Sequence, residues 1–257
     1  MTDTIPWRRY VAIGDSFTEG VGDPEPSLPG GLRGWADRVA EVLAGLTDDF
    51  AYANLAVRGK LLDQIAADQA GTALGLHPDL VTVSAGGNDI LRPGTDPDEV
   101  ADRLDALVAM LRVDGATVVV FTGPDIGMTP VMRTIRGKVA IFNENVHALA
   151  LRRGAVVADM WALRQLADAR MWSADRLHFS PLGHHTIARA VLDALGVEHE
   201  LEPLEVPPLP AKSWRAARAE DLHWTREHLI PWIGRRLTGR SSGDGRTPKR
   251  PDLAPPL

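Results

Sequence analysis

The sequence of 257 residues contains no cysteine. Disulfide frameworks, thiolate nucleophiles and cysteine-ligated zinc or iron–sulfur sites are therefore excluded. Residues 1–10 contain no apolar run of the kind that a secretory signal requires. The chain also lacks a run of about 18 or more apolar residues, which a membrane-spanning helix needs. We therefore expect a cytoplasmic protein with no stable membrane insertion.

Positive charges are outnumbered by negative ones. Lysine and arginine number 28 against 34 aspartates and glutamates, which gives a formal net charge of −6 at pH 7. Because phosphate contacts need a basic field, this balance argues against a nucleic-acid partner. Hydrophobic residues make up 44% and charged residues 24% of the chain, as is typical of a globular protein. The length suits one α/β domain with an extension, or two small domains.

Five short apolar runs rich in β-branched residues alternate with helical patterns. The runs are Tyr10–Ile13, Ala51–Ala56, Leu80–Ser84, Thr117–Phe121 and Ala155–Asp159. Two of them are almost continuously apolar, as in strands that are covered on both faces of a parallel sheet. Helical spacing of apolar residues recurs around residues 35–46, 61–66, 100–111 and 139–151, and again over Thr186–Leu195. This alternation predicts βαβ units in a three-layer α/β/α sandwich.

The composition changes after about residue 200. Residues 200–210 are rich in proline, which breaks regular structure. Residues 213–237 can form an amphipathic helix, kinked or ended by Pro231, whose apolar stripe holds Trp214, Leu222, Leu229 and Ile233. The last twenty residues, rich in Gly, Ser, Pro and Arg, are expected to be disordered. We therefore divide the chain into a domain of residues 1–200 and a C-terminal extension of residues 201–257.

Residues suited to catalysis follow three of the expected strands. Ser16 comes directly after the first strand and before an expected helix start, where ligand sites of parallel sheets collect. Asn88 follows the third strand and can donate from its side-chain amide. Gly59, after the second strand, would place a backbone N–H at the same edge. Taken singly, each signal is explained as well by a helix cap or a tight turn.

A carboxylate and a histidine lie three residues apart near the end of the domain. Asp175 can hold the Nδ1–H of His178 and leave Nε2 facing a hydroxyl, which is what a serine nucleophile requires of its base. A metal site that adds His184 and His185 is a less favoured alternative, because adjacent histidines on a helix point in different directions. A nucleotide-binding function is also disfavoured, because neither G-x-G-x-x-G nor G-x-x-x-x-G-K-[ST] occurs.

Four motifs in one order resemble the SGNH, or GDSL-type, hydrolase superfamily. They are GDSFTEG at residues 14–20, the glycine at position 59, GGND at residues 86–89 and DRLHFSPLGH at residues 175–184. The resemblance extends from about Tyr10 to Leu195. The runs NLAVRGKLLDQI and HPDLVTVSAGGNDILRPG are similar to those of bacterial, actinobacterial-type members. Phe17 departs from the family's nickname, which has leucine at that position.

This resemblance implies a flavodoxin-like parallel sheet of five strands in the order 2-1-3-4-5. It further implies that Ser16 attacks an acyl carbonyl, that His178 accepts the serine proton and that Asp175 orients the imidazole. The oxyanion would be held by the backbone N–H groups of Ser16 and Gly59 and by the side-chain amide of Asn88. No cofactor and no metal are expected.

The expected function is therefore a serine-dependent carboxylic ester hydrolase. It would act through an acyl-enzyme on a small or short-acyl ester, with O-acetyl, lipid and aryl esters all open. The alternatives are an acyltransferase, which shares the acyl-enzyme chemistry, and a non-catalytic flavodoxin-like ligand-binding module. Substrate contacts are expected from the loop Gly123–Arg136, including Arg133 and Arg136. Oligomeric state stays open, and so does the choice between docking, lid, dimer and membrane-surface roles for the C-terminal helix.

Overall fold

A six-stranded sheet forms the centre of the computed structural model, which describes residues 5–112, 115–127, 130–206, 208, 213–229 and 241–256. The strand order is β5-β4-β3-β1-β2-β6. The first five strands are parallel, and β6 runs antiparallel to β2. The strands are β1 (Arg9–Gly14), β2 (Ala51–Asn54), β3 (Leu80–Ser84), β4 (Thr117–Phe121), β5 (Val156–Ala158) and β6 (Arg250–Ala254). The predicted order 2-1-3-4-5 is confirmed for the parallel strands.

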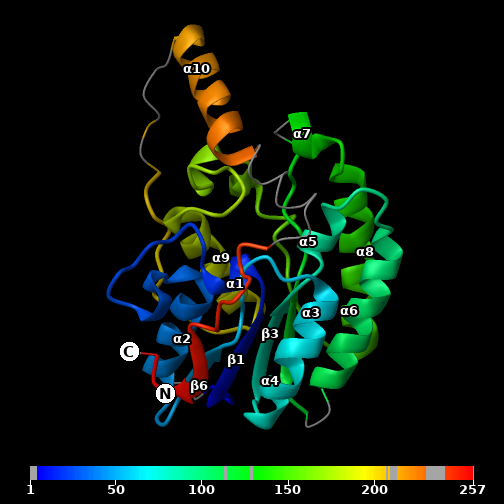
Figure 1. The fold of residues 1–257 in the computed structure, drawn as a ribbon. Coiled ribbons are helices and arrows are strands. Elements are labelled where there is room, and N and C mark those ends of the chain that lie inside the picture. The colour runs from blue at the N-terminus through cyan, green and yellow to red at the C-terminus, as the bar shows by residue number, and fades with distance from the viewer. Residues whose placement is uncertain are drawn as a thin grey trace.

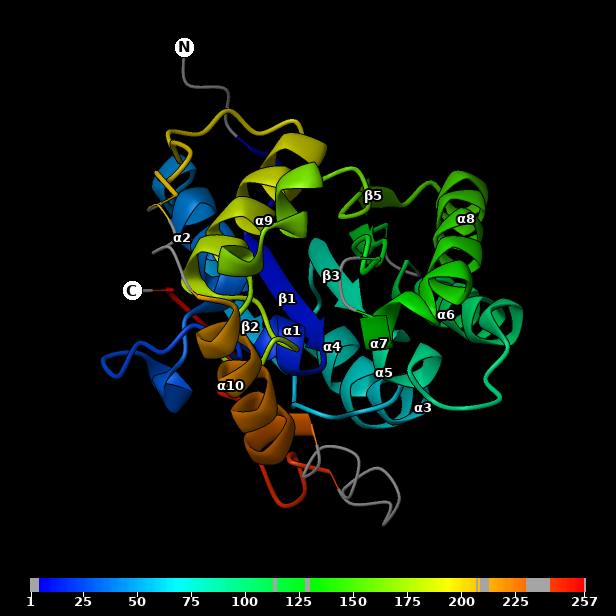
Figure 2. The same cartoon turned by 90° about the horizontal axis from the view of Figure 1, so that it is seen from above.

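Helices cover both faces of the sheet, as Figures 1 and 2 show. One face carries α2 (Gly34–Leu46) and α9 (Pro181–Ala194). The other carries a continuous helical stretch, followed by two long helices: α3 (Leu62–Ile65), η2 (Ala66–Ala70), α4 (Gly71–Gly75), α6 (Pro97–Leu111) and α8 (Arg136–Arg153). Each face has its own apolar cluster, because alternate residues of the central strands point to opposite sides. The predicted three-layer sandwich is confirmed.

Short helical turns follow the strands. They are α1 (Ser16–Glu19), α5 (Gly87–Ile90) and α7 (Pro130–Arg133), with further turns at η1 (Pro29–Gly31), η3 (Arg164–Ala167) and η4 (Ala169–Met171). In Figure 1, α1, α5 and α7 lie above the strands at the end where β1 and β3 finish. This edge is where open α/β sheets bind their ligands.

The C-terminal extension is more ordered than the sequence suggests. Its described elements are α10 (Trp214–Trp224), η5 (Thr225–Leu229) and β6. The predicted disordered tail is wrong for residues 250–254, because β6 pairs with β2, the edge strand that would otherwise leave its backbone groups unpaired. Two members of the predicted apolar stripe are also not buried: Trp214 is 70% and Leu222 is 63% exposed. Pro231 and Ile233 lie outside the described residues, and the division at residue 200 stays a prediction.

Candidate active site

Ser16 stands at the first position of α1, directly after β1. The residue before it caps the helix, because Asp15 Oδ1 accepts a hydrogen bond of 3.0 Å from the backbone N–H of Phe17. The Phe17 ring packs against Trp35, Phe121 and Phe179, at centroid distances of 5.4, 5.5 and 5.6 Å. Phenylalanine in place of the family's leucine is therefore accommodated by an aromatic cluster that anchors the turn carrying Ser16.

Asp175 and His178 form the pair that the sequence predicts. His178 Nδ1 lies 2.6 Å from Asp175 Oδ2. The other oxygen, Oδ1, accepts from the backbone N–H groups of Leu177 and His178 and from Ser173 Oγ, at 2.9, 3.0 and 2.6 Å. Burial by itself would raise the pKa of Asp175, but the hydrogen bonds and charge of His178 and the bond from Ser173 hold it well below its ordinary value. The carboxylate therefore stays ionised and fixes the proton on Nδ1.

The loop after α1 meets the loop that carries His178 at one glycine. Gly22 has φ +101°, and a Cβ there would lie 2.1 Å from the carbonyl oxygen of Phe179 and 3.2 Å from the Cβ of His178. A side chain at this position would push the two loops apart. The glycine thus lets the chain that follows Ser16 pass directly against the histidine, although the sequence motif gives no hint of this contact.

Ser16, Asn88 and His178 line one pocket of about 210 Å³. Most of the rest of its lining is apolar and includes Ile90, Ile126, Met132, Ile135, Phe142 and Met160. Three of these come from the loop Gly123–Arg136, so the predicted loop does face the pocket, although Met128 and Thr129 lie outside the described residues. The two predicted arginines do not line it. Arg136 instead binds Asp125 at 2.6 Å and lies 5.0 Å over the ring of Trp161.

The side-chain amide of Asn88 reaches the same rim as Ser16. Its Nδ2 donates to Asp15 Oδ2 at 2.9 Å and to the carbonyl oxygen of Lys60 at 3.1 Å. The neighbouring Asp89 accepts from the backbone N–H of Leu62 at 3.0 Å. The GGND turn is thereby tied both to the turn of Ser16 and to the loop after β2, which brings three separate segments together.

Gly59 lies in that loop but is not one of the residues lining the pocket. Its φ is +76°, and a Cβ there would lie 2.1 Å from Ser241 Oγ. The preceding residue connects the loop to α1, because Arg58 donates to Glu19 through its backbone N–H at 2.7 Å and through Nε at 2.9 Å. The oxyanion role of Gly59 therefore stays a prediction, whereas the attachment of its loop to the Ser16 turn is a feature that the sequence did not reveal.

A buried glutamine that the sequence analysis missed holds the end of β1. Gln69 accepts from the backbone N–H of Gly14 at 2.8 Å and donates to its carbonyl oxygen at 2.8 Å. It lies in η2, a π-helical turn, and such turns often occur at functional sites. Its spacing of four residues from the buried Ile65 is the only signal in the sequence that could have identified it.

The two histidines of the alternative metal site face elsewhere. His184 is buried: its Nδ1 accepts from the backbone N–H of Trp35, and its Nε2 donates to the carbonyl oxygen of Val21, both at 3.2 Å. Burial lowers the pKa of His184 to about 4, so the ring is neutral. His185 Nε2 binds the carbonyl oxygen of Glu202 at 2.8 Å. Within the described ranges, no three histidine, aspartate or glutamate side chains are grouped as metal ligands.

Asp15 is a buried carboxylate with a raised pKa. It is 8% exposed, and burial raises its pKa to about 6, against the opposing effects of the hydrogen bond from Phe17 and the charge of His178. The folded protein therefore holds a proton on Asp15 more tightly than the unfolded chain, whose ordinary value is about 3.9. The resulting contribution to stability grows as pH falls through about 6 and is lost as pH rises through it.

Asp15→Asn is expected to remove this pH dependence. The free energy of unfolding of the variant minus that of the parent should become more positive by about 2 kcal/mol between pH 4.5 and 8. Urea unfolding at a series of pH values measures this difference, with the exposed Asp48→Asn as the control. A difference that stays constant, or that falls with rising pH, would contradict the electrostatic account of Asp15.

Comparison with known proteins identifies a family and several solved structures with the same fold. A model of the GDSL-like Lipase/Acylhydrolase family matches residues 12–186. Solved structures with the same fold include LAE5, an alpha/beta hydrolase enzyme from the metagenome of Lake Arreo, at 23% identity and a TM-score of 0.61, covering 76% of this chain and 98% of that one. TesA matches at 20% identity and a TM-score of 0.61, over 73% of this chain and 97% of its own.

The acetylxylan esterase Axe2 from Geobacillus stearothermophilus also matches, at 21% identity and a TM-score of 0.60, over 77% of this chain and 98% of that chain. Two other matched structures are described as catalytic mutants of Axe2, one a histidine-to-alanine and one a serine-to-alanine variant. No match is found among curated proteins. Within the described part of the chain, no helix combines the length and the apolarity needed to cross a bilayer.

Proposed function

This chain belongs to the GDSL-like lipase/acylhydrolase family, and from that premise we propose that it is a serine esterase whose catalytic triad is Ser16, His178 and Asp175. One observation carries the proposal: Ser16 lines the same pocket as a histidine whose Nδ1 lies 2.6 Å from an ionised carboxylate. This arrangement places an imidazole of fixed tautomer in the same pocket as a hydroxyl, and nucleophilic catalysis requires these two groups to work together.

The chemistry follows from these three side chains. Ser16 Oγ attacks the ester carbonyl carbon while His178 Nε2 accepts the hydroxyl proton, and the imidazolium that forms is stabilised by Asp175. The imidazolium then protonates the leaving alcohol, and an acyl group remains on Ser16. Water, deprotonated by His178, attacks the acyl-enzyme, and collapse of the second tetrahedral intermediate releases the acid and restores the serine.

The oxyanion of each tetrahedral intermediate needs preorganised donors. We assign this role to the backbone N–H of Ser16, the side-chain amide of Asn88 and the backbone N–H of Gly59. The amide of Asn88 already lies at the pocket rim, where Asp15 and the carbonyl of Lys60 hold it. In the transition state, the amide hydrogen that binds the Lys60 carbonyl in the free protein binds the oxyanion instead. The other amide hydrogen stays on Asp15, which continues to orient the side chain.

Asn88→Ala is expected to lower kcat about 100- to 1,000-fold, because one oxyanion donor is lost. KM should change much less, since this donor acts on charge that develops only in the transition state. Steady-state kinetics with a p-nitrophenyl ester measures both constants. An unchanged kcat would remove Asn88 from the oxyanion site and leave the triad assignment standing.

The pocket lining supports an apolar acyl group. The side chains that surround the space beside Ser16 are mostly aliphatic or aromatic, among them Ile90, Val139 and Phe142. Neither Arg133 nor Arg136 lines the pocket, so the loop Gly123–Arg136 offers no cation to bind a negatively charged group on the acyl part of a substrate. We therefore assign an unbranched acyl chain of several carbons to this pocket, longer than the small or short acyl group that the sequence favoured.

A series of p-nitrophenyl esters from acetate to octanoate tests this assignment. Each added methylene that enters the pocket is expected to raise kcat/KM about fourfold, until the pocket is full. Val139→Phe should shorten the preferred chain, whereas Ile141→Phe on the same helix should not, because Ile141 is 48% exposed and outside the pocket. Highest activity with acetate, falling with every carbon, would contradict an apolar acyl site.

Two further assays test another ester substrate and the alternative reaction of acyl transfer. Acetylated xylo-oligosaccharides test the activity named for the matched acetylxylan esterases. Added alcohol acceptors test acyl transfer, because the acyl-enzyme can pass its acyl group to an alcohol instead of water. Formation of a new ester in proportion to the alcohol would identify a transferase on the same triad.

A further inference from the structure

The C-terminal strap, which we define as the described residues 213–229 and 241–256, contacts two loops of the active site. We propose that it positions these loops for catalysis: Trp224 holds the loop of Asp175 and His178, and Ser241 holds the loop of Arg58 and Gly59. The inference rests on the proposed esterase function and extends it to two residues beyond the family motifs, which end at residue 184.

The first contact is at the turn between the two triad residues of that loop. Trp224 Nε1 donates a hydrogen bond of 2.8 Å to the carbonyl oxygen of Asp175. Between Asp175 and His178, Arg176 adopts φ +55°, a left-handed conformation that is unfavourable for a residue with a side chain. The Arg176 guanidinium lies 5.1 Å over the Trp224 ring and binds Asp221 at 2.7 Å. Helix α10 therefore holds the strained turn from outside.

Of these contacts, the indole hydrogen bond matters most. The ion pair between Arg176 and Asp221 is exposed, with 41% and 63% of the two side chains accessible, and pairs of this kind contribute little. The indole N–H instead reaches the main chain at Asp175, in a partly buried position. A main-chain contact fixes the backbone from which the carboxylate projects.

The second contact is at the loop of Gly59, on another segment of the strap. Ser241 Oγ donates to the carbonyl oxygen of Arg58 at 3.3 Å and accepts from the backbone N–H of Gly243 at 3.0 Å. The fit is close on both sides. A Cβ on Gly59 would lie 2.1 Å from Ser241 Oγ, and a Cβ on Gly243 would lie 2.0 Å from the Arg58 carbonyl oxygen.

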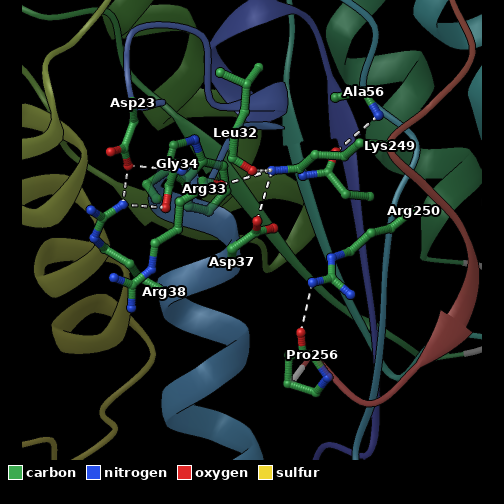
Figure 3. A network of polar contacts seen from close by, with 12 residues as sticks. Asp23, Leu32, Arg33, Gly34, Asp37, Arg38, Ala56, Lys249, Arg250 and Pro256 are labelled. Carbon is green, nitrogen blue, oxygen red and sulfur yellow. Dashed lines mark hydrogen bonds and ion pairs between the residues drawn. The ribbon is translucent and has the colours of Figure 1, made fainter. Parts of the chain in front are cut away.

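Further along, just before β6, the strap is anchored to the start of α2. Lys249 Nζ donates to Asp37 at 2.9 Å and to the carbonyl oxygens of Leu32 and Arg33 at 3.2 and 2.8 Å, as Figure 3 shows. Only 3% of the Lys249 side chain and 2% of that of Asp37 are exposed. Removing one partner of such a pair would leave the other charge buried without its counter-charge. The pair therefore fixes the point at which the strap enters β6 at the edge of the sheet.

The strap does not act as a substrate lid. None of the residues that line the pocket belongs to the described residues 213–229 and 241–256. It touches the two loops through residues that do not line the pocket, and so it should change the rate of the chemical step and leave substrate binding alone. This distinction separates a positioning role from a binding role and is open to kinetic measurement.

Trp224→Phe tests the first contact, because phenylalanine keeps an aromatic ring beneath Arg176 and removes the N–H donor, together with part of the indole ring that the control substitution also removes. We expect kcat to fall about three- to tenfold with KM within twofold of the parent. Trp214→Phe is the matched control, since Trp214 lies on the same helix, is 70% exposed and has the Arg218 guanidinium 5.3 Å over its ring. Its kinetic constants should equal those of the parent.

Ser241→Ala tests the second contact independently, with the adjacent exposed Ser242→Ala as its control. A fall in kcat of similar size is expected, and because the two contacts lie on separate loops, the double variant should show the product of the two effects. Parental kcat in both Trp224→Phe and Ser241→Ala, or an equal loss in the controls, would overturn the inference. A rise in KM alone would instead make the strap part of the binding site.

Hydrogen exchange separates failure of the inference from failure of the proposed function, because it needs no turnover. Trp224→Phe should speed amide exchange in residues 173–180 and leave residues 57–61 unchanged, and Ser241→Ala should do the reverse. Altered exchange in a protein without esterase activity would refute the function and keep the positioning contacts. Unaltered exchange together with parental activity would refute the strap and keep the function.

Discussion

Ser16→Ala is expected to lower kcat for ester hydrolysis by about 10⁴- to 10⁶-fold, to the level that the oxyanion donors and the pocket sustain alone. No acyl-enzyme can form at this residue without Oγ. The fold should persist, because the cap of α1 is the side chain of Asp15 and not that of Ser16. Steady-state kinetics with the preferred p-nitrophenyl ester gives the ratio.

The matched control is Ser27→Ala, which makes the same change at an exposed site. Its kcat should equal that of the parent, and circular dichroism should show the same thermal unfolding for all three proteins. Retention of more than about a hundredth of the parental kcat in Ser16→Ala would contradict a covalent mechanism at this residue.

Asp175→Asn is expected to lower kcat about 10³- to 10⁴-fold. An asparagine cannot stabilise the imidazolium that forms in the transition state, and its amide hydrogens favour the wrong tautomer of His178. The same carboxylate also accepts from two backbone N–H groups of its own turn, which an asparagine oxygen can still do in part. The loss should therefore fall mainly on kcat.

Asp168→Asn provides the control for Asp175→Asn. Asp168 lies in the same segment of the chain, and its bond with Arg170 lowers its pKa to about 2, so it too is an ionised, partly buried carboxylate. It does not line the pocket, and kcat should stay within twofold of the parent. Equal losses in both variants would mean that any charge change in this segment lowers activity.

The sign of the pH dependence distinguishes the two aspartates at the site. The lowered pKa of Asp175 gives stability that is present above its ordinary value and is lost as pH falls below about 4. Asp15 behaves in the opposite way, because its raised pKa makes the folded state more stable as pH falls through about 6. At neutral pH the protein therefore keeps Asp15 charged at a cost in stability, and this carboxylate orients Asn88 at the pocket rim.

The sheet could be predicted from the sequence because its strands are buried on both faces. Leu80–Ser84 and Thr117–Phe121 begin and end where the apolar runs do. The edge strand β6 was harder to predict, because it contains Pro251 and Asp252, both poor strand formers. It forms because β2 offers an open edge and because Asp37 provides a buried partner for Lys249. Such pairing over about 200 residues leaves no local pattern in the sequence.

The predicted site residues lie in short sequence motifs, whereas the residues that hold them in place do not. Ser16, Asn88 and His178 stand in motifs whose order along the chain points to one pocket, and the structure brings them together there. Gln69 and the pair of Glu19 with Arg58 act through contacts between distant segments, which a single sequence does not encode visibly. Gly59 shows the intermediate case: its place in the loop was predicted, but its contact with Ser241 was not.

Mass spectrometry of the protein after reaction with a fluorophosphonate tests the central claim most directly, because the reagent modifies a serine only where a base activates it. The account predicts a single adduct on the peptide that contains Ser16, formed rapidly in the parent and lost in His178→Ala. An adduct on a different serine, or undiminished labelling of Ser16 without His178, would contradict the triad proposed for this chain.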